Sequence, residues 1–214
     1  MDELFEAVAM ENFGWIKANF SPSWLNAVDG EGSTVLCRAI GGSENFLNSL
    51  LSLGFDPNVP DRVHQLPPLY FAVIGEHCLT VEVLLKHGAA ISVTDTGDSE
   101  LHYAAQNGLN EIVELLACNC DLTDLNRHDN LGMTPLMYAV ANGFQLVVKT
   151  LVLAGSDVNS TKQSTGGETA LHLAAQYQQD DIYHYLVEVG GSEEIMDVFG
   201  ISPKTRMKRG PFLN

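Results

Sequence analysis

A short segment that recurs along the chain at nearly constant spacing is the feature that most limits how this protein can fold. Its clearest copy is residues 167–175, GETALHLAA, and related segments begin at Gly132 (GMTPLMYA) and Gly97 (GDSELHYAA). Looser copies are QLPPLYFA from Gln65, GSTVLCRA from Gly32 and LFEA from Leu4. The leucine that they share falls at Leu4, Leu36, Leu69, Leu101, Leu136 and Leu171, which gives steps of 32, 33, 32, 35 and 35 residues. A period of this length predicts a solenoid of stacked repeats.

The repeats resemble those of the ankyrin-repeat family, in which a β-turn precedes two short antiparallel helices and a T-P-L-H-x-A-like start recurs about every 33 residues. The best matches are TALH at 169–172 and TPLM at 134–137, and second-helix endings of the Leu-Leu-x-x-Gly type occur at 84–88 and 151–155. The pattern departs at Ser99-Glu100, which replaces Thr-Pro, and at Cys120, which replaces a glycine. The resemblance covers residues 2–203 and implies an all-α fold, an ankyrin-repeat solenoid of helix-turn-helix units with short β-hairpin loops.

Applied to the whole chain, the repeat pattern predicts one ankyrin-repeat domain over residues 1–203. A capping repeat occupies about 1–28, and the following repeats occupy about 29–61, 62–93, 94–128, 129–163 and 164–200. The first repeat matches weakly because a terminal layer covers its neighbour with one face and meets water with the other. Residues 201–204, ISPK, resemble the truncated start of a seventh unit, and residues 204–214 are predicted to be a basic, flexible tail.

The charge balance restricts the classes of partner. The net charge is −16, and the basic Lys204, Arg206, Lys208 and Arg209 lie at the end of an otherwise strongly acidic chain. An acidic body repels nucleic-acid phosphates and anionic lipid, so we expect neither nucleic acid nor a membrane as a partner but a protein with a basic surface. The alternative is that the acidity only keeps the chain soluble. The chain is expected to be a monomer on its own.

Hydropathy and the first residues give the expected location. The sequence has no uninterrupted apolar run of about 18 residues, which argues against a membrane span. Its start, Met1-Asp2-Glu3, is acidic and no long apolar segment follows, so no classical secretory signal is expected. A cytoplasmic location is therefore the expectation.

Cysteines and histidines are the candidate metal-binding or catalytic groups of the sequence. Cys37, Cys78, Cys118 and Cys120 show no framework spacing and are most simply reduced, partly buried residues. Cys118 and Cys120 with His128 offer half a metal site, but structural zinc usually takes four ligands, so no metal or other cofactor is expected. The family resemblance assigns His102 and His172 a structural role in bridging neighbouring turns.

No catalytic motif stands out. The sequence lacks a Ser-His-Asp pattern, a phosphate-binding glycine loop and a paired-carboxylate motif, so we expect no enzyme activity. The spacing of Leu151, Asp157, Val158 and Asn159 resembles an asparagine-hydroxylation acceptor of ankyrin domains. The alternative is that Asp157 and Asn159 hydrogen-bond to nearby backbone in a turn.

Ankyrin-like proteins usually bind partners with their hairpin tips and with exposed positions of their first helices, and the resemblance transfers these positions to this chain. The hairpin positions are Glu31, Ser33, Val63, His64, Leu66, Asp95, Thr96, Asp98, Asn130, Leu131, Met133, Thr165 and Glu168. The first-helix positions are Ile74, Gln106, Asn107, Asn142, Gln176 and Tyr177. Leu66, Leu131 and Met133 are the most informative, because an apolar residue at a hairpin tip has no core to fill unless it packs on the adjacent hairpin.

These observations favour a non-catalytic module that binds a basic partner protein through a concave acidic face. One concrete version is an inhibitor or immunity protein of a cognate toxin or enzyme. The alternative is an ankyrin adaptor or targeting domain of a larger effector whose catalytic part lies outside this sequence.

Overall fold

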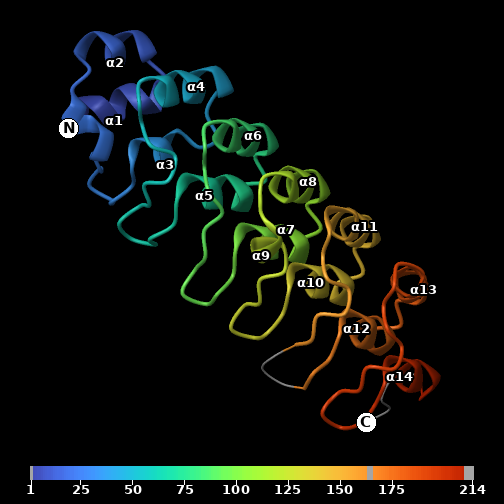
Figure 1. Ribbon diagram of the computed structural model, residues 1–214. Coiled ribbons are helices and arrows are strands. Elements are labelled where there is room, and N and C mark those ends of the chain that lie inside the picture. Colours follow the sequence, from blue (N-terminus) through green and yellow to red (C-terminus); the bar gives the residue numbers. More distant parts are fainter. Residues whose placement is uncertain (1, 163–165, 210–214) are drawn as a thin grey trace. The chain divides into compact units, whose positions relative to one another are not determined.

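The computed structural model describes residues 2–162 and 166–209, and these form helices joined by turns and loops (Figure 1). The chain divides into two compact units, Met1–Ser92 and Val93–Asn214. Within the described residues the elements are helices, and β-structure is limited to isolated antiparallel bridges such as Val28 with Thr34 and Val93 with Ser99. The predicted all-α class is confirmed. A single domain over 1–203 stays a prediction.

The first unit contains three helix pairs. Its helices are α1 (Asp2–Ala9), α2 (Phe13–Asn19), α3 (Val35–Ala39), α4 (Glu44–Ser52), α5 (Pro68–Ile74) and α6 (Cys78–Lys86), with the 3-10 helix η1 (Pro22–Asn26) after α2. First helices pack on first helices, α1 on α3 and α3 on α5, while α2 packs on α4 and α4 on α6. This side-by-side stacking is the arrangement that the repeat period predicts.

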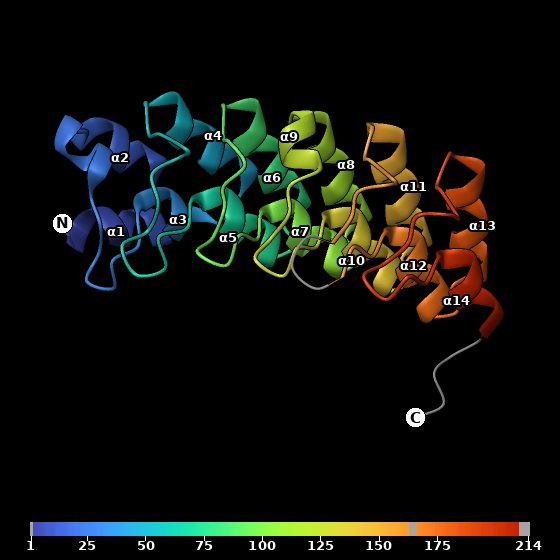
Figure 2. The ribbon, with the colours of Figure 1, turned by 60° about the horizontal axis from the view of Figure 1, so that its bottom comes forward.

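The second unit follows the same plan. Its helices are α7 (Glu100–Gln106), α8 (Asn110–Cys118), α9 (Leu122–Leu125), α10 (Pro135–Ala141), α11 (Gln145–Ala154), α12 (Ala170–Gln176), α13 (Asp180–Glu188) and α14 (Pro203–Arg209). The first helices α7, α10, α12 and α14 pack in sequence, and α8, α11 and α13 form the second row. Within each unit the loops before the first helices project on the side away from the second helices (Figures 1 and 2). We call each of these loops a finger.

The shared leucine holds each repeat to the next. Leu36, Leu69, Leu101, Leu136 and Leu171 are all buried, and so are small neighbours such as Ala104 and Ala174. A fully buried leucine side chain contributes about 2–3 kcal/mol relative to an exposed one. Alanine at the helix contacts removes bulk, so the first helices can approach closely.

His102 and His172 bridge neighbouring repeats, as the resemblance implied. The Ser99 N–H donates to Nδ1 of His102 (3.2 Å), and Nε2 of the same ring donates to the carbonyl oxygens of Arg127 (3.1 Å) and Met133 (3.2 Å). His172 repeats the scheme with Thr169 and the carbonyl oxygen of Ile201 (3.0 Å). Each imidazole therefore caps its own helix and ties down the next finger.

The structure differs from the prediction of a flexible tail from residue 204. Residues 203–209 form α14, the first helix of the expected seventh unit, and it packs on α12. Arg206 is only 5% exposed and pairs with Glu168 (2.5 Å) and Asp197 (2.6 Å). The basic residue that suggested a solvated tail is instead part of a buried ion pair. Residues 210–214 lie outside the described residues.

Candidate protein-binding surface

An aspartate at the base fixes the backbone of several fingers. Oδ1 of Asp29 accepts the backbone N–H groups of Glu31 and Ser33, both at 2.9 Å. Asp129 and Asp197 do the same for the residues two and four positions later, at 2.8–2.9 Å. These bonds satisfy N–H groups that a tight turn would otherwise leave exposed.

The second carboxylate oxygen of these aspartates binds a side chain on the following helix. Arg38 reaches Oδ2 of Asp29 (2.7 Å), the Tyr138 hydroxyl donates to Oδ2 of Asp129 (2.6 Å), and Arg206 reaches Oδ2 of Asp197 (2.6 Å). In every case the partner lies nine positions after the aspartate. Each of these three fingers is therefore tied to the first helix of its own repeat.

The ionisation of these groups follows from their contacts. Burial opposes the charged form of Asp197, but the N–H groups of Ile201 and Phe199 and the charge of Arg206 outweigh it and lower the pKa. The pKa of Asp29 is lowered in the same way, against its burial, by Ser33, Glu31 and Arg38. Burial and the hydrogen bond to Asp129 raise the pKa of the Tyr138 hydroxyl. Asp29 and Asp197 are thus held as carboxylates at the bases of their fingers.

The finger after α4 uses a different arrangement. Asp61 accepts the N–H groups of His64 and Leu66, each at 3.1 Å, and its Oδ2 lies 3.0 Å from Nδ1 of His64. His64 was predicted as a contact residue, and its ring is exposed while it also closes this loop. Its neighbour Val63 is exposed at the tip.

Most predicted contact positions are on the surface. The exposed ones are Glu31, Val63, His64, Ile74, Asp95, Thr96, Gln106, Asn107, Asn130, Leu131, Asn142, Gln176 and Tyr177, and the half-buried ones are Ser33, Leu66, Asp98 and Glu168. Met133 is a correction: only 7% of it is exposed, because its backbone N–H binds Asp129 and draws the residue into the base of the finger. Thr165 lies outside the described residues.

Some carboxylates of the predicted acidic face already form ion pairs within the chain. Glu31 pairs with Arg38 at 2.7 Å, and Glu168 pairs with the buried Arg206. Asp98 accepts the hydroxyl of Thr96 (2.7 Å), while Asp95 is exposed. The acidic character of the fingers is therefore carried mainly by Asp95 and Asp98 in the second unit.

Apolar side chains are exposed at the tips of two fingers in the second unit. Leu131 is 63% exposed, and Met196, Val198 and Phe199 on the last finger are 65–79% exposed. The sequence prediction missed this last group. The signal was available, because ISPK at 201–204 has the register of a repeat start and so places 196–199 at a fingertip.

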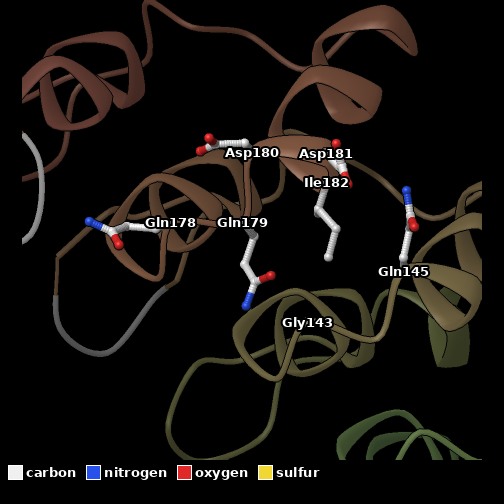
Figure 3. Close-up of a pocket in the computed structure, with 7 residues that line it drawn as sticks. All are labelled: Gly143, Gln145, Gln178, Gln179, Asp180, Asp181 and Ile182. Atoms are coloured by element: carbon white, nitrogen blue, oxygen red, sulfur yellow. The ribbon is translucent and has the colours of Figure 1, made fainter.

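A hollow of about 410 Å³ lies where α13 begins, and it is lined by Gly143, Gln145, Gln178, Gln179, Asp180, Asp181 and Ile182. Figure 3 shows Gln179 and Ile182 pointing toward the turn at Gly143. The lining offers amides and carboxylates but no nucleophile beside a base. Within the described residues, no three His, Cys, Asp or Glu side chains gather in a way that suits a metal ion.

Comparison with known proteins decides the family. The family model for ankyrin repeats (three copies) matches residues 40–126 and 101–197, well over half of the chain. The chain belongs to the ankyrin-repeat family. Ankyrin repeats indicate a protein–protein interaction module, and the family is generally non-catalytic.

The curated relatives of this ankyrin-repeat chain are larger proteins. It is 38% identical over 125 residues to the p105 subunit of nuclear factor NF-kappa-B from Gallus gallus, covering 56% of this chain and 12% of that protein. It is 23% identical over 238 residues to the fowlpox virus ankyrin repeat protein FPV022, covering 86% and 40%. Human Rabankyrin-5 is 33% identical over 139 residues, covering 63% and 12%. The chain thus spans less than half the length of these relatives.

Asn159, the candidate hydroxylation acceptor, forms hydrogen bonds to the backbone of the next repeat. Oδ1 of Asn159 accepts the Ser192 N–H (2.8 Å), and its Nδ2 donates to the Gly190 carbonyl oxygen (3.0 Å). Asn58 makes the matching bonds to Ala90 and Gly88, so this asparagine position joins neighbouring second helices. In the part of the chain that the structure describes, every helix is too short or too polar to cross a membrane.

Proposed function

We propose that this ankyrin-repeat chain binds a partner protein that presents lysine and arginine, using its fingertips and the ends of its first helices. The observation that carries the proposal is the contrast between base and tip within two fingers of the second unit, those before α10 and α14. Asp129 and Asp197 fix the finger bases, while Leu131 and Phe199 are exposed at the tips. Apolar side chains on a rigid frame lose little entropy on binding and suit interface anchors.

The charges beside the anchors define the partner's chemistry. The backbone N–H of Asn130 donates to the Thr96 carbonyl oxygen (3.0 Å), and its Nδ2 donates to the Asp95 carbonyl oxygen (3.0 Å). These bonds hold the finger of Leu131 beside the finger of Asp95 and Asp98. An apolar anchor flanked by carboxylates matches a basic surface with a shallow apolar pocket, and the net charge of −16 would speed its approach.

Binding is itself the proposed activity, in the form of blocking or sequestering the partner, as an inhibitor or immunity protein does. The adaptor alternative is favoured by a specific observation, because this chain matches only 12–40% of the length of its relatives p105, FPV022 and Rabankyrin-5. In that case the same surface would recruit a target to another part of a longer polypeptide.

The test is capture of a partner by the purified chain at low and raised salt, followed by affinity measurements with variants. Leu131→Glu and Asp95→Lys should each weaken binding at least about tenfold, and raised salt should weaken it further. Leu153→Glu is the matched control, because Leu153 is also exposed but lies on the second helix α11. Unchanged affinity for both finger variants would disprove this site.

A further inference from the structure

A second pocket lies on the first repeat, away from the fingers. It has a volume of about 340 Å³ and is lined by Glu3, Glu6, Ala7, Met10, Asn12 and Trp15. Glu3, Glu6 and Ala7 belong to α1, Trp15 belongs to α2, and Met10 and Asn12 lie in the turn that joins the two helices. The proposed function does not use this pocket.

The aromatic wall of the pocket is held in place by other rings. The indole of Trp15 stacks on that of Trp24 with centroids 5.8 Å apart and an interplanar angle of 7°. Trp24 meets Phe20 edge-on (6.4 Å), and Phe20 meets the buried Phe55 (6.2 Å). Oδ1 of Asn12 caps α2 by accepting the backbone N–H of Trp15 (3.1 Å). The wall is therefore preorganised, which lowers the entropy cost of binding.

The other sides of the pocket are acidic and apolar. Glu3 and Glu6 are three positions apart, so their carboxylates lie on one face of α1. Both are exposed, and neither forms an ion pair with another described residue. Met10 is 82% exposed and lines the same pocket as Trp15. The lining contains no basic side chain to neutralise the two acids.

We propose that this pocket binds an arginine side chain of a partner peptide. A guanidinium group is planar and can lie against the Trp15 indole while it donates to the carboxylates of Glu3 and Glu6. The methylene groups of arginine can pack on Met10 and Ala7. Lysine carries the same charge but is more strongly hydrated and has no planar fork, so it fits this combination less well.

Intrinsic tryptophan fluorescence gives a direct test, because the two tryptophans of the chain are the stacked pair at this pocket. The probes are the peptide acetyl-Gly-Arg-Gly-amide and its counterpart with citrulline, which keeps the shape of arginine but is neutral. The arginine peptide should give a saturable signal change, with affinity about tenfold above that of the citrulline peptide. A lysine peptide should fall between them.

Two double variants distinguish binding at this pocket from nonspecific attraction to the acidic chain. The double substitution Glu3→Gln and Glu6→Gln should abolish the preference for arginine over citrulline. Glu76→Gln with Glu188→Gln is the matched control, since it removes the same charge at exposed positions outside the pocket and should leave binding intact. Circular dichroism confirms that each variant is folded. The Leu131→Glu variant should also retain arginine binding. The proposed finger site and the proposed arginine pocket can therefore be disproved independently.

Two results would overturn the proposal. One is equal binding of the arginine and citrulline peptides, or an unchanged preference in the Glu3 and Glu6 variant. The other is concentration-dependent self-association that this variant abolishes, because the pocket would then receive a second copy of the chain, for example the exposed Lys204 or Lys208 of α14.

Discussion

His102 shows how a single side chain holds two repeats together. The ring is 1% exposed and bonds to Ser99 in its own repeat and to the Arg127 and Met133 carbonyl oxygens ahead of the next helix. The family resemblance predicted this role for His102 and His172. The finger aspartates were not recognised, because their partners lie nine positions away and vary among Arg38, Tyr138 and Arg206. Only the structure shows that these different side chains serve one purpose.

Replacing His102 with alanine should destabilise the chain by about 2–4 kcal/mol, since it leaves a cavity and several buried backbone groups without partners. Urea unfolding measures the change. His77→Ala, at an exposed position, is the control and should cost under about 0.5 kcal/mol. Equal losses for the two variants would contradict the bridging role.

Stability should fall as the pH is lowered from about 7 to about 5. Burial lowers the pKa of both His102 and His172 below the ordinary value of 6.5, against the hydrogen bonds that favour protonation. The unfolded chain therefore takes up protons first as the pH falls through about 6.5, which favours unfolding. The urea concentration at the midpoint of unfolding should decrease as the pH is lowered across this range. The decrease should be smaller in the variant that carries both His102→Gln and His172→Gln. A midpoint that rises on acidification would refute the argument.

Helix α14 is held in place by ion pairs of Arg206 with Glu168 and Asp197. The sequence predicted the start of this unit from ISPK but not the helix that follows. The residues that hold α14, Glu168 and Asp197, lie 38 and nine positions before Arg206, and no local pattern announces them. By contrast, the first and second helices of the other repeats were predicted, because leucine and alanine recur with a regular period.

Arg206→Met should release α14 and the finger before it. The substitution removes the partner of Asp197, whose side chain is fully buried, and loss of one member of a buried pair costs about 3–5 kcal/mol. Hydrogen exchange should accelerate in residues 203–209 and 196–201 and remain unchanged in the first unit. Lys204→Met, at an exposed position on the same helix, should have no such effect. If the amides of α14 stayed fully protected from hydrogen exchange in the Arg206 variant, the ion pairs of Arg206 would not be what holds this helix.

At the scale of the whole molecule, the dominant physical property is a net charge of −16 spread over many short repeats. Internal pairs such as Lys86 with Glu82 leave this net charge unchanged, because it already counts every lysine and arginine. Repulsion among the unpaired carboxylates opposes the folded state, and 0.1 M salt largely screens the interactions between exposed charges that lie more than about 10 Å apart. We therefore expect the melting temperature to rise with sodium chloride at neutral pH. A melting temperature that falls with salt would show that attractive pairs outweigh the repulsion.

The internal closure of each finger has a consequence for how the family can diversify. In the fingers closed by Asp129 and Asp197, the aspartate and its helical partner complete the turn within one repeat. Leu131 and Phe199 contribute their backbone N–H groups to this closure, while their side chains are exposed at the tips. Mutation at the tips is therefore nearly neutral for folding, and selection can act there on recognition alone. A chain built in this way can acquire a new target through substitutions at a few solvent-exposed residues, while its scaffold stays intact.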